Sequence, residues 1–226
     1  MSLFEFKKEN RRLFLKIFGI KMNFVLPFGG NNKIIIVDKK GKERQVPFIL
    51  GIRTHFHGSN AVLKVCSPMP RFVNCNFTFD DESVIEIGSS DDYIRKMKVV
   101  TEAKGSKLII GKNFGLNDGL FLFHKKENNK IEIGNDTKAR FLTVRTCDGH
   151  IIRDLETNEI INPDGDIKIG NNVWITGFNT ILKNVVIPDY TIIANHAVVT
   201  KAFEESYTVI GGLPAKVVKR GVKWEF

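Results

Sequence analysis

Residues 166–201 read DIKIGNNVWITGFNTILKNVVIPDYTIIANHAVVTK. In this stretch an aliphatic residue recurs at every sixth position, and a small or medium-sized residue stands four places after each of the first five. This period fits neither an α-helix nor the alternation of an isolated strand. It fits a triangular coil whose short strands each send one aliphatic side chain inward, and whose successive turns pair as parallel strands. The aliphatic positions are Ile169, Ile175, Ile181, Ile187, Ile193 and Val199, and the smaller ones are Val173, Asn179, Val185, Thr191 and Ala197.

Earlier segments keep the six-residue spacing more loosely. Leu116 and Leu122 follow Ile110 at this spacing, and Thr143 follows Thr137, with irregular insertions between the matching pieces. We therefore predict an all-β fold in which a parallel β-helix runs through most of the chain.

The predicted β-helix covers residues 30–204 and is followed by a C-terminal turn and tail at 205–226. Residues 151–166 are rich in Asp, Asn, Pro and Gly, which predicts a loop that leaves the coil and carries function. Residues 1–29 mix lysine and arginine with leucine, isoleucine and phenylalanine, which favours a short amphipathic helix covering an open end of the coil. The alternative is a helix that lies on an anionic membrane surface.

Composition restricts the classes of function. Cys66, Cys75 and Cys147 match neither a disulfide framework nor a zinc pattern, and no signal peptide or membrane-spanning stretch is recognised, which favours a reducing cytoplasm. The net charge of +9 is spread along the chain without a nucleic-acid-binding motif, so we expect no nucleic acid partner. A basic surface suits a polyphosphate cosubstrate or an acidic polysaccharide instead.

Several of these stretches resemble one known family, the hexapeptide-repeat O-acetyltransferases that act on bacterial capsule and lipopolysaccharide sugars. The spacing between His150 and Trp174 is most similar to that of the sialic acid and capsule O-acetyltransferases. The chain departs from the family pattern at Thr176, at Ala194-Asn195-His196, and at Cys147, where serine is common. The stretches that carry the resemblance are VRTCDGH at 144–150, DIKIGNNVWI at 166–175, TILK at 180–183, VVTK at 198–201 and GLPAK at 212–216.

The resemblance implies a left-handed β-helix, acetyl-CoA as cosubstrate, a polysaccharide or sugar acceptor, and no metal. It also implies homotrimers with each active site between neighbouring subunits. A location in the bacterial cytoplasm follows from the same family, with peripheral membrane contact through the N-terminal segment as an open alternative.

His150 is the predicted catalytic base. Acetyl transfer from a thioester needs a base that removes the proton from a sugar hydroxyl, and histidine titrates in the range that suits this task. Asp148 or Asp154 would fix the tautomer of the imidazole. Trp174 is expected to line the acceptor and acetyl site, although a packing role on the outer surface is an equal alternative.

The coenzyme A site predicted from the family lies at the C-terminal end of the coil. Lysine ammonium groups serve as point charges for phosphates. The predicted binding residues are Trp174, Gly177, Thr200, Lys201, Gly212, Pro214, Ala215, Lys216 and Lys219.

Three alternatives to direct O-acetyl transfer remain at this stage: a covalent route, N-acetylation and a non-catalytic role. Cys147 beside His150 raises a covalent route through a cysteine thiolate. His55 and His57 alternate on one predicted strand, but the sequence places no third metal ligand near them, so we expect an ordinary pair and no metal site. His196 is expected at an outward corner. The fold also serves N-acetyltransferases of amino sugars and non-catalytic assembly modules.

Overall fold

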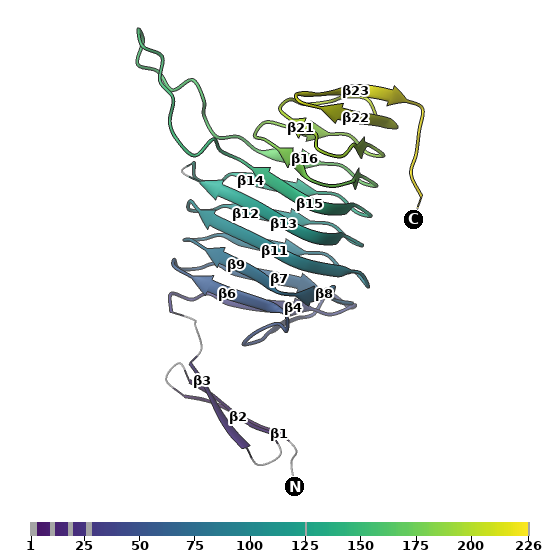
Figure 1. The fold of residues 1–226 in the computed structure, drawn as a ribbon. Coiled ribbons are helices and arrows are strands. Elements are labelled where there is room, and N and C mark those ends of the chain that lie inside the picture. The colour runs from purple at the N-terminus through teal and green to yellow at the C-terminus, as the bar shows by residue number, and fades with distance from the viewer. Residues whose placement is uncertain (1–3, 10–11, 18–19, 26–28, 125, 226) are drawn as a thin grey trace.

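The computed structural model describes residues 4–9, 12–17, 20–25, 29–124 and 126–225. Figure 1 shows a tall stack of coils with a separate three-stranded piece at the N-terminal end. No α-helix occurs in the described residues, and therefore none that could span a membrane.

The N-terminal segment forms strands where a helix was predicted. β1 (Phe4–Glu9), β2 (Arg12–Ile17) and β3 (Ile20–Val25) pair as an antiparallel sheet. The apolar residues of β3 alternate with polar ones, at Ile20, Met22 and Phe24, which is the period of a strand and not of a helix. The expected helix is therefore wrong, and a membrane-bound helix at this end has no support in the structure.

The coil stack has three faces, which we number by the order in which each turn visits them. Face 1 is a sheet of parallel strands with one antiparallel strand, β5, at its end. Its strands are β4 (Lys33–Val37), β5 (Glu43–Gln45), β7 (Val62–Cys66), β10 (Val84–Ile87), β12 (Lys107–Ile110), β14 (Lys130–Ile133), β16 (Ile167–Ile169) and β19 (Val186–Ile187).

Faces 2 and 3 are joined by three long strands, β11 (Tyr93–Glu102), β13 (Gly115–His124) and β15 (Lys138–Arg145), which bend from one face to the other. Their first halves lie on face 2 and their second halves on face 3. Face 2 adds β8 (Arg71–Val73), β17 (Trp174–Ile175), β20 (Ile192–Ile193), β22 (Thr208–Gly212) and its antiparallel partner β23 (Ala215–Arg220). Face 3 adds β6 (Ile52–Phe56), β9 (Cys75–Phe79), β18 (Asn179–Ile181) and β21 (Val198–Val199).

The core is a continuous column of stacked side chains. All six aliphatic residues of the repeat at 169–199 are buried, with exposed fractions of 1% or less, and the smaller residues of that repeat are buried too. On face 3 one inward column of aromatic and aliphatic residues runs through successive coils in strict register. Its members are Phe77, Val99, Phe121, Val144, Ile181 and Val199.

The register predicted for the earlier coils was wrong by one residue. Leu122 and Thr143 are half-buried, whereas their neighbours Phe121 and Val144 point inward. The reason is a tighter corner between faces 2 and 3, where Ala139 aligns with Ile175 and Val144 with Ile181. A six-residue count from the inward Leu116 therefore overshoots Phe121 and reaches Leu122. Thr143 instead falls one residue short of Val144, because its count starts at Thr137, two residues before the inward Ala139.

The turns of the early coils are also longer. Leu63, Ile85, Leu108 and Ile131 occupy one position in successive coils, so each of these turns takes 22 or 23 residues. Two coils later, Ile169 and Ile187 are 18 residues apart. The regular hexapeptide pattern is consequently visible only in the last coils.

An arm leaves the coil after β15. Residues 146–166 contain no strand beyond one antiparallel bridge between Arg153 and Ile160, and Figure 1 shows this arm projecting from the upper end of the stack. Leu155 at the arm is fully exposed. On another side of the stack, β22 and β23 lead into a C-terminal tail that runs back along the coils.

Candidate active site

His150 lies in the arm, close to the point where it leaves the coil. Its side chain is exposed and lines an open hollow of about 290 Å³ together with Lys126, Ile160, Asn162 and Asp164. The imidazole is therefore accessible to a substrate, which a general base requires.

A polar network anchors the backbone on both sides of His150. Asn162 donates from Nδ2 to Asp148 Oδ2 at 3.0 Å and to the His150 carbonyl oxygen at 2.9 Å. Lys183, in the turn after β18, donates from Nζ to Asp148 Oδ2 at 2.5 Å and to the Asn162 carbonyl oxygen at 2.9 Å. Lys183 thus fastens the arm to the coil at Asp148 and Asn162, and Asn162 in turn holds the His150 carbonyl oxygen.

The two carboxylates predicted to orient His150 are engaged elsewhere in the described structure. The Lys183 ammonium, followed by the Asn162 amide, lowers the pKa of the Asp148 carboxyl. Asp154 accepts from the backbone N–H groups of Glu156 and Thr157, and these bonds lower its pKa. Asp148 therefore positions the backbone of the loop, and its role toward the imidazole stays a prediction.

Sequence reasoning assigned no role to Lys183 or Asn162. Lys183 ends the family-like stretch TILK, but its partner Asp148 lies 35 residues earlier in the chain. Only the coil stacking brings the two together.

Cys147 is buried beneath the loop, with 2% of its surface exposed. Burial raises the pKa of its thiol, which disfavours the thiolate that a covalent route requires. The buried thiol of Cys147 is therefore poorly suited to act as a nucleophile.

We predict that Cys147→Ser leaves the turnover number within about twofold of the native value, because a buried protonated thiol acts by packing. Steady-state kinetics, together with a search for an acylated protein by intact mass, would check this. A collapse of the rate, or an acetyl adduct on the native chain that the variant lacks, would restore the covalent route.

Trp174 lies on face 2, in register with Lys138 at the beginning of β15. Its ring is 40% exposed and lies 6.1 Å, centroid to centroid, from that of Trp224 in the C-terminal tail. Trp224 is held there because its Nε1 donates to the Asn172 carbonyl oxygen at 2.7 Å. No pattern in the sequence predicts this pairing, because the two residues are 50 positions apart.

His150 and Trp174 do not share a hollow within one chain. Trp174 adjoins the first residue of β15 on face 2, whereas His150 follows the last residue of that strand, on the side of the arm. Figure 1 shows the arm and the C-terminal tail on different sides of the stack.

The residues predicted to bind coenzyme A lie on the last coils. Gly212, Pro214 and Ala215 form the hairpin turn between β22 and β23, and Lys216 and Lys219 are exposed on β23. Thr200 and Lys201 are exposed just after β21, and Gly177 lies in the corner between β17 and β18. Within the part of the chain that the structure describes, no carboxylate pairs with Lys201, Lys216 or Lys219.

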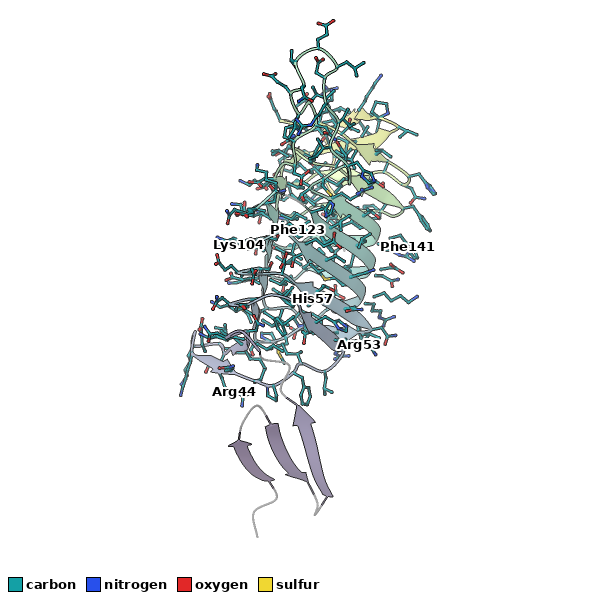
Figure 2. The ribbon with its side chains drawn as sticks, turned by 90° about the vertical axis from the view of Figure 1, so that its left-hand side faces the viewer. Arg44, Arg53, His57, Lys104, Phe123 and Phe141 are labelled. Atoms are coloured by element: carbon teal, nitrogen blue, oxygen red, sulfur yellow. The ribbon has the colours of Figure 1, made fainter. Side chains whose placement is uncertain are left out.

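An aromatic stack marks the corner between faces 2 and 3. Phe141 and Phe178 stack at 4.4 Å between centroids, and Phe178 and His196 at 5.0 Å, with nearly parallel planes in both pairs. In Figure 2, Phe141 lies on the outer edge of the coil stack. His196 is exposed at this corner, as predicted, but it is also the end of an aromatic column.

The comparisons with known proteins identify acetyltransferases. No family model matches the chain. The polysialic acid O-acetyltransferase of Escherichia coli O1:K1 / APEC is 34% identical over 126 residues, which cover 55% of this chain and 40% of the relative. The polysialic acid O-acetyltransferase of Neisseria meningitidis is 43% identical over 99 residues, which cover 43% of this chain and 46% of the relative. The matches thus span less than half of either relative.

The solved structures extend the likeness over most of the coil stack. The polysialic acid O-acetyltransferase OatWY superposes with a TM-score of 0.65 at 25% identity, covering 88% of this chain and 92% of that one. The polysialic acid-specific acetyltransferase NeuO has the same fold, with a TM-score of 0.61. The predicted resemblance to the O-acetyltransferases of sialic acids and capsules is confirmed.

Proposed function

We propose that this protein is an acetyl-CoA-dependent O-acetyltransferase that acts on a hydroxyl of a cell-surface polysaccharide sugar or its precursor. The observation that carries the proposal is an exposed histidine, His150, whose backbone is fixed by Asp148, Asn162 and Lys183 in a coil stack similar to that of OatWY.

In the proposed reaction the His150 imidazole takes the proton of the attacking hydroxyl. The hydroxyl oxygen forms a bond to the thioester carbonyl carbon, and the carbon–sulfur bond breaks as the coenzyme A thiolate leaves. The imidazolium then returns its proton to that thiolate. The buried thiol of Cys147 takes no part, since its raised pKa keeps it protonated.

We further infer that the complete site forms between copies of the chain in a homotrimer of left-handed coils. His150 and Trp174 line separate hollows of one chain, so a substrate that meets both would have to lie between two copies. Lys201, Lys216 and Lys219 lie exposed on the coils that would receive the coenzyme A phosphates. We expect the reaction to take place in the cytoplasm, where acetyl-CoA is formed.

The test is acetyl transfer by the full chain from acetyl-CoA to a short oligosialic acid and to nucleotide-linked sugars. We expect an acetylated product in the mass spectrum whose acetyl group hydroxylamine removes, which identifies an ester. A product that resists hydroxylamine would identify an amide and an N-acetyltransferase instead. If calorimetry detects no acetyl-CoA binding, both the O-acetyltransferase and the N-acetyltransferase hypotheses are wrong, and the result supports a non-catalytic assembly module.

A further inference from the structure

The second hollow of interest lies on face 2, below Trp174. It has a volume of about 260 Å³ and is lined by side chains of successive coils, on β11, β13, β15 and β17. We call it the arginine hollow and define it by Tyr93, Arg95, Asn117, Arg140 and Trp174. None of the site residues predicted from the sequence, apart from Trp174, lies in it.

Arg95 is held over an aromatic ring. Its guanidinium carbon lies 4.4 Å from the centroid of the Tyr93 ring, and Arg71 approaches the same ring at 5.3 Å. Arg71 also donates from Nη1 to the Tyr93 hydroxyl at 2.9 Å, which fixes the ring. A stacked guanidinium keeps its edge N–H groups free for an anion.

Arg140 occupies the position that corresponds to Arg95 two coils further along the stack. Arg95 is in register with Asn117, and Asn117 with Arg140, on neighbouring parallel strands. Two strand spacings place the Cα atoms of the two arginines about 10 Å apart, with the Asn117 amide between them. Arg140 also stacks on Phe141, with its guanidinium carbon 5.7 Å from that ring centroid.

The charge of the arginine hollow is not neutralised by its own wall. Lys138 is paired with Asp92, Nζ to Oδ2 at 2.6 Å. Across the residues that the structure describes, no carboxylate oxygen lies within ion-pair distance of Arg95 or Arg140. Both guanidinium groups are exposed, so they are available to a ligand.

The floor of the hollow requires a glycine. Gly115 lies between Asp92 and Lys138, and a Cβ atom added there would approach Asp92 Oδ2 to 2.4 Å and Lys138 Cδ to 3.1 Å. Gly115 therefore leaves room for the Asp92–Lys138 ion pair beside it.

We propose that the arginine hollow is an acceptor subsite that binds the carboxylates of an acidic glycan and thereby places the glycan beside Trp174. A guanidinium matches a carboxylate with two parallel N–H donors. The two arginines and the amide between them suit an acceptor with more than one acidic sugar, and Trp174 offers a ring face to sugar C–H groups. This inference rests on the proposed function and names the residues that select the acceptor.

The experiment measures binding of a short oligosialic acid to the full chain by calorimetry, without acetyl-CoA, so that no turnover is required. The variants are Arg95→Gln, Arg140→Gln and the double variant. The matched control is Arg44→Gln, which removes an exposed guanidinium from β5 at the other end of the stack (Figure 2). A carboxyl-reduced oligosaccharide of the same length is the second probe.

We expect each single variant to weaken binding about tenfold and the double variant more strongly, because each removes charge-assisted hydrogen bonds. Arg44→Gln should bind as the native chain does, and the carboxyl-reduced probe should bind native and double-variant chains equally weakly. Equal affinity of native and double-variant chains for the acidic probe would overturn the inference, even if acetyl transfer occurs. Failure of the proposed function would show differently, as normal arginine-dependent binding without formation of an acetyl ester.

Discussion

Replacement of His150 by glutamine is expected to abolish most of the acetyl transfer while leaving the protein folded. Loss of a general base lowers the rate by a factor of about 10² to 10⁴. The side chain is exposed, and the anchoring bonds of the loop come from the His150 backbone and from Asp148, Asn162 and Lys183, so the variant keeps its local structure. The measurement is kcat with acetyl-CoA and an oligosialic acid at saturating concentrations.

The matched control is His55→Gln, because His55 is an exposed histidine on β6 at the far end of the coil stack. We expect this variant to turn over at the native rate, and both variants to bind acetyl-CoA with unchanged affinity. A His150→Gln enzyme with a native kcat would rule out the assignment of the base, and attention would move to His196 at the aromatic corner.

Replacement of Phe121 by alanine is expected to lower the free energy of unfolding by about 3–5 kcal/mol. Phe121 is fully buried and lies in register between Val99 and Val144 in the inward column of face 3. Removal of the ring leaves a cavity between the coil that carries Val99 and the coil that carries Val144. Each coil contacts only the coils next to it, so no distant segment can fill this cavity. Urea unfolding followed by circular dichroism gives the free energy change.

Leu122→Ala is the control that tests the register. Leu122 is half-buried and belongs to the same strand, so its loss should cost about 1 kcal/mol. If the six-residue count held in this coil, Leu122 would be the inward residue and the order of the two costs would be reversed.

Most of the coil architecture was predictable because the repeat is local. Within residues 169–199 each strand, corner and inward residue recurs at a fixed spacing, and burial follows this spacing throughout. The same prediction failed at Leu122 because one corner is a residue shorter there, and at Thr143 because the count starts at Thr137 and not at the inward Ala139. It also failed in the N-terminal segment, where a basic apolar pattern was read as a helix although the structure has strands.

The candidate site was predictable only as single residues. His150, Trp174 and the lysines of the last coils are candidates that short stretches of sequence suggest, since each is embedded in a recognisable motif. Their partners were not found. Lys183 meets Asp148, Trp224 meets Trp174, and Arg140 joins Arg95 only across the coil stack.

The sequence by itself therefore determined the parallel coil of the C-terminal half and singled out His150 as the candidate for the base, because both predictions rest on continuous stretches. The tertiary structure alone decided that His150 and Trp174 line different hollows, and that Arg95 and Arg140, to which the described residues offer no carboxylate partner, lie in register beside Trp174. The physical reason is that parallel stacking brings together residues separated by one or more turns. The length of each turn, 18 residues in one coil and 22 or 23 in others, depends on corners and insertions that no local pattern specifies.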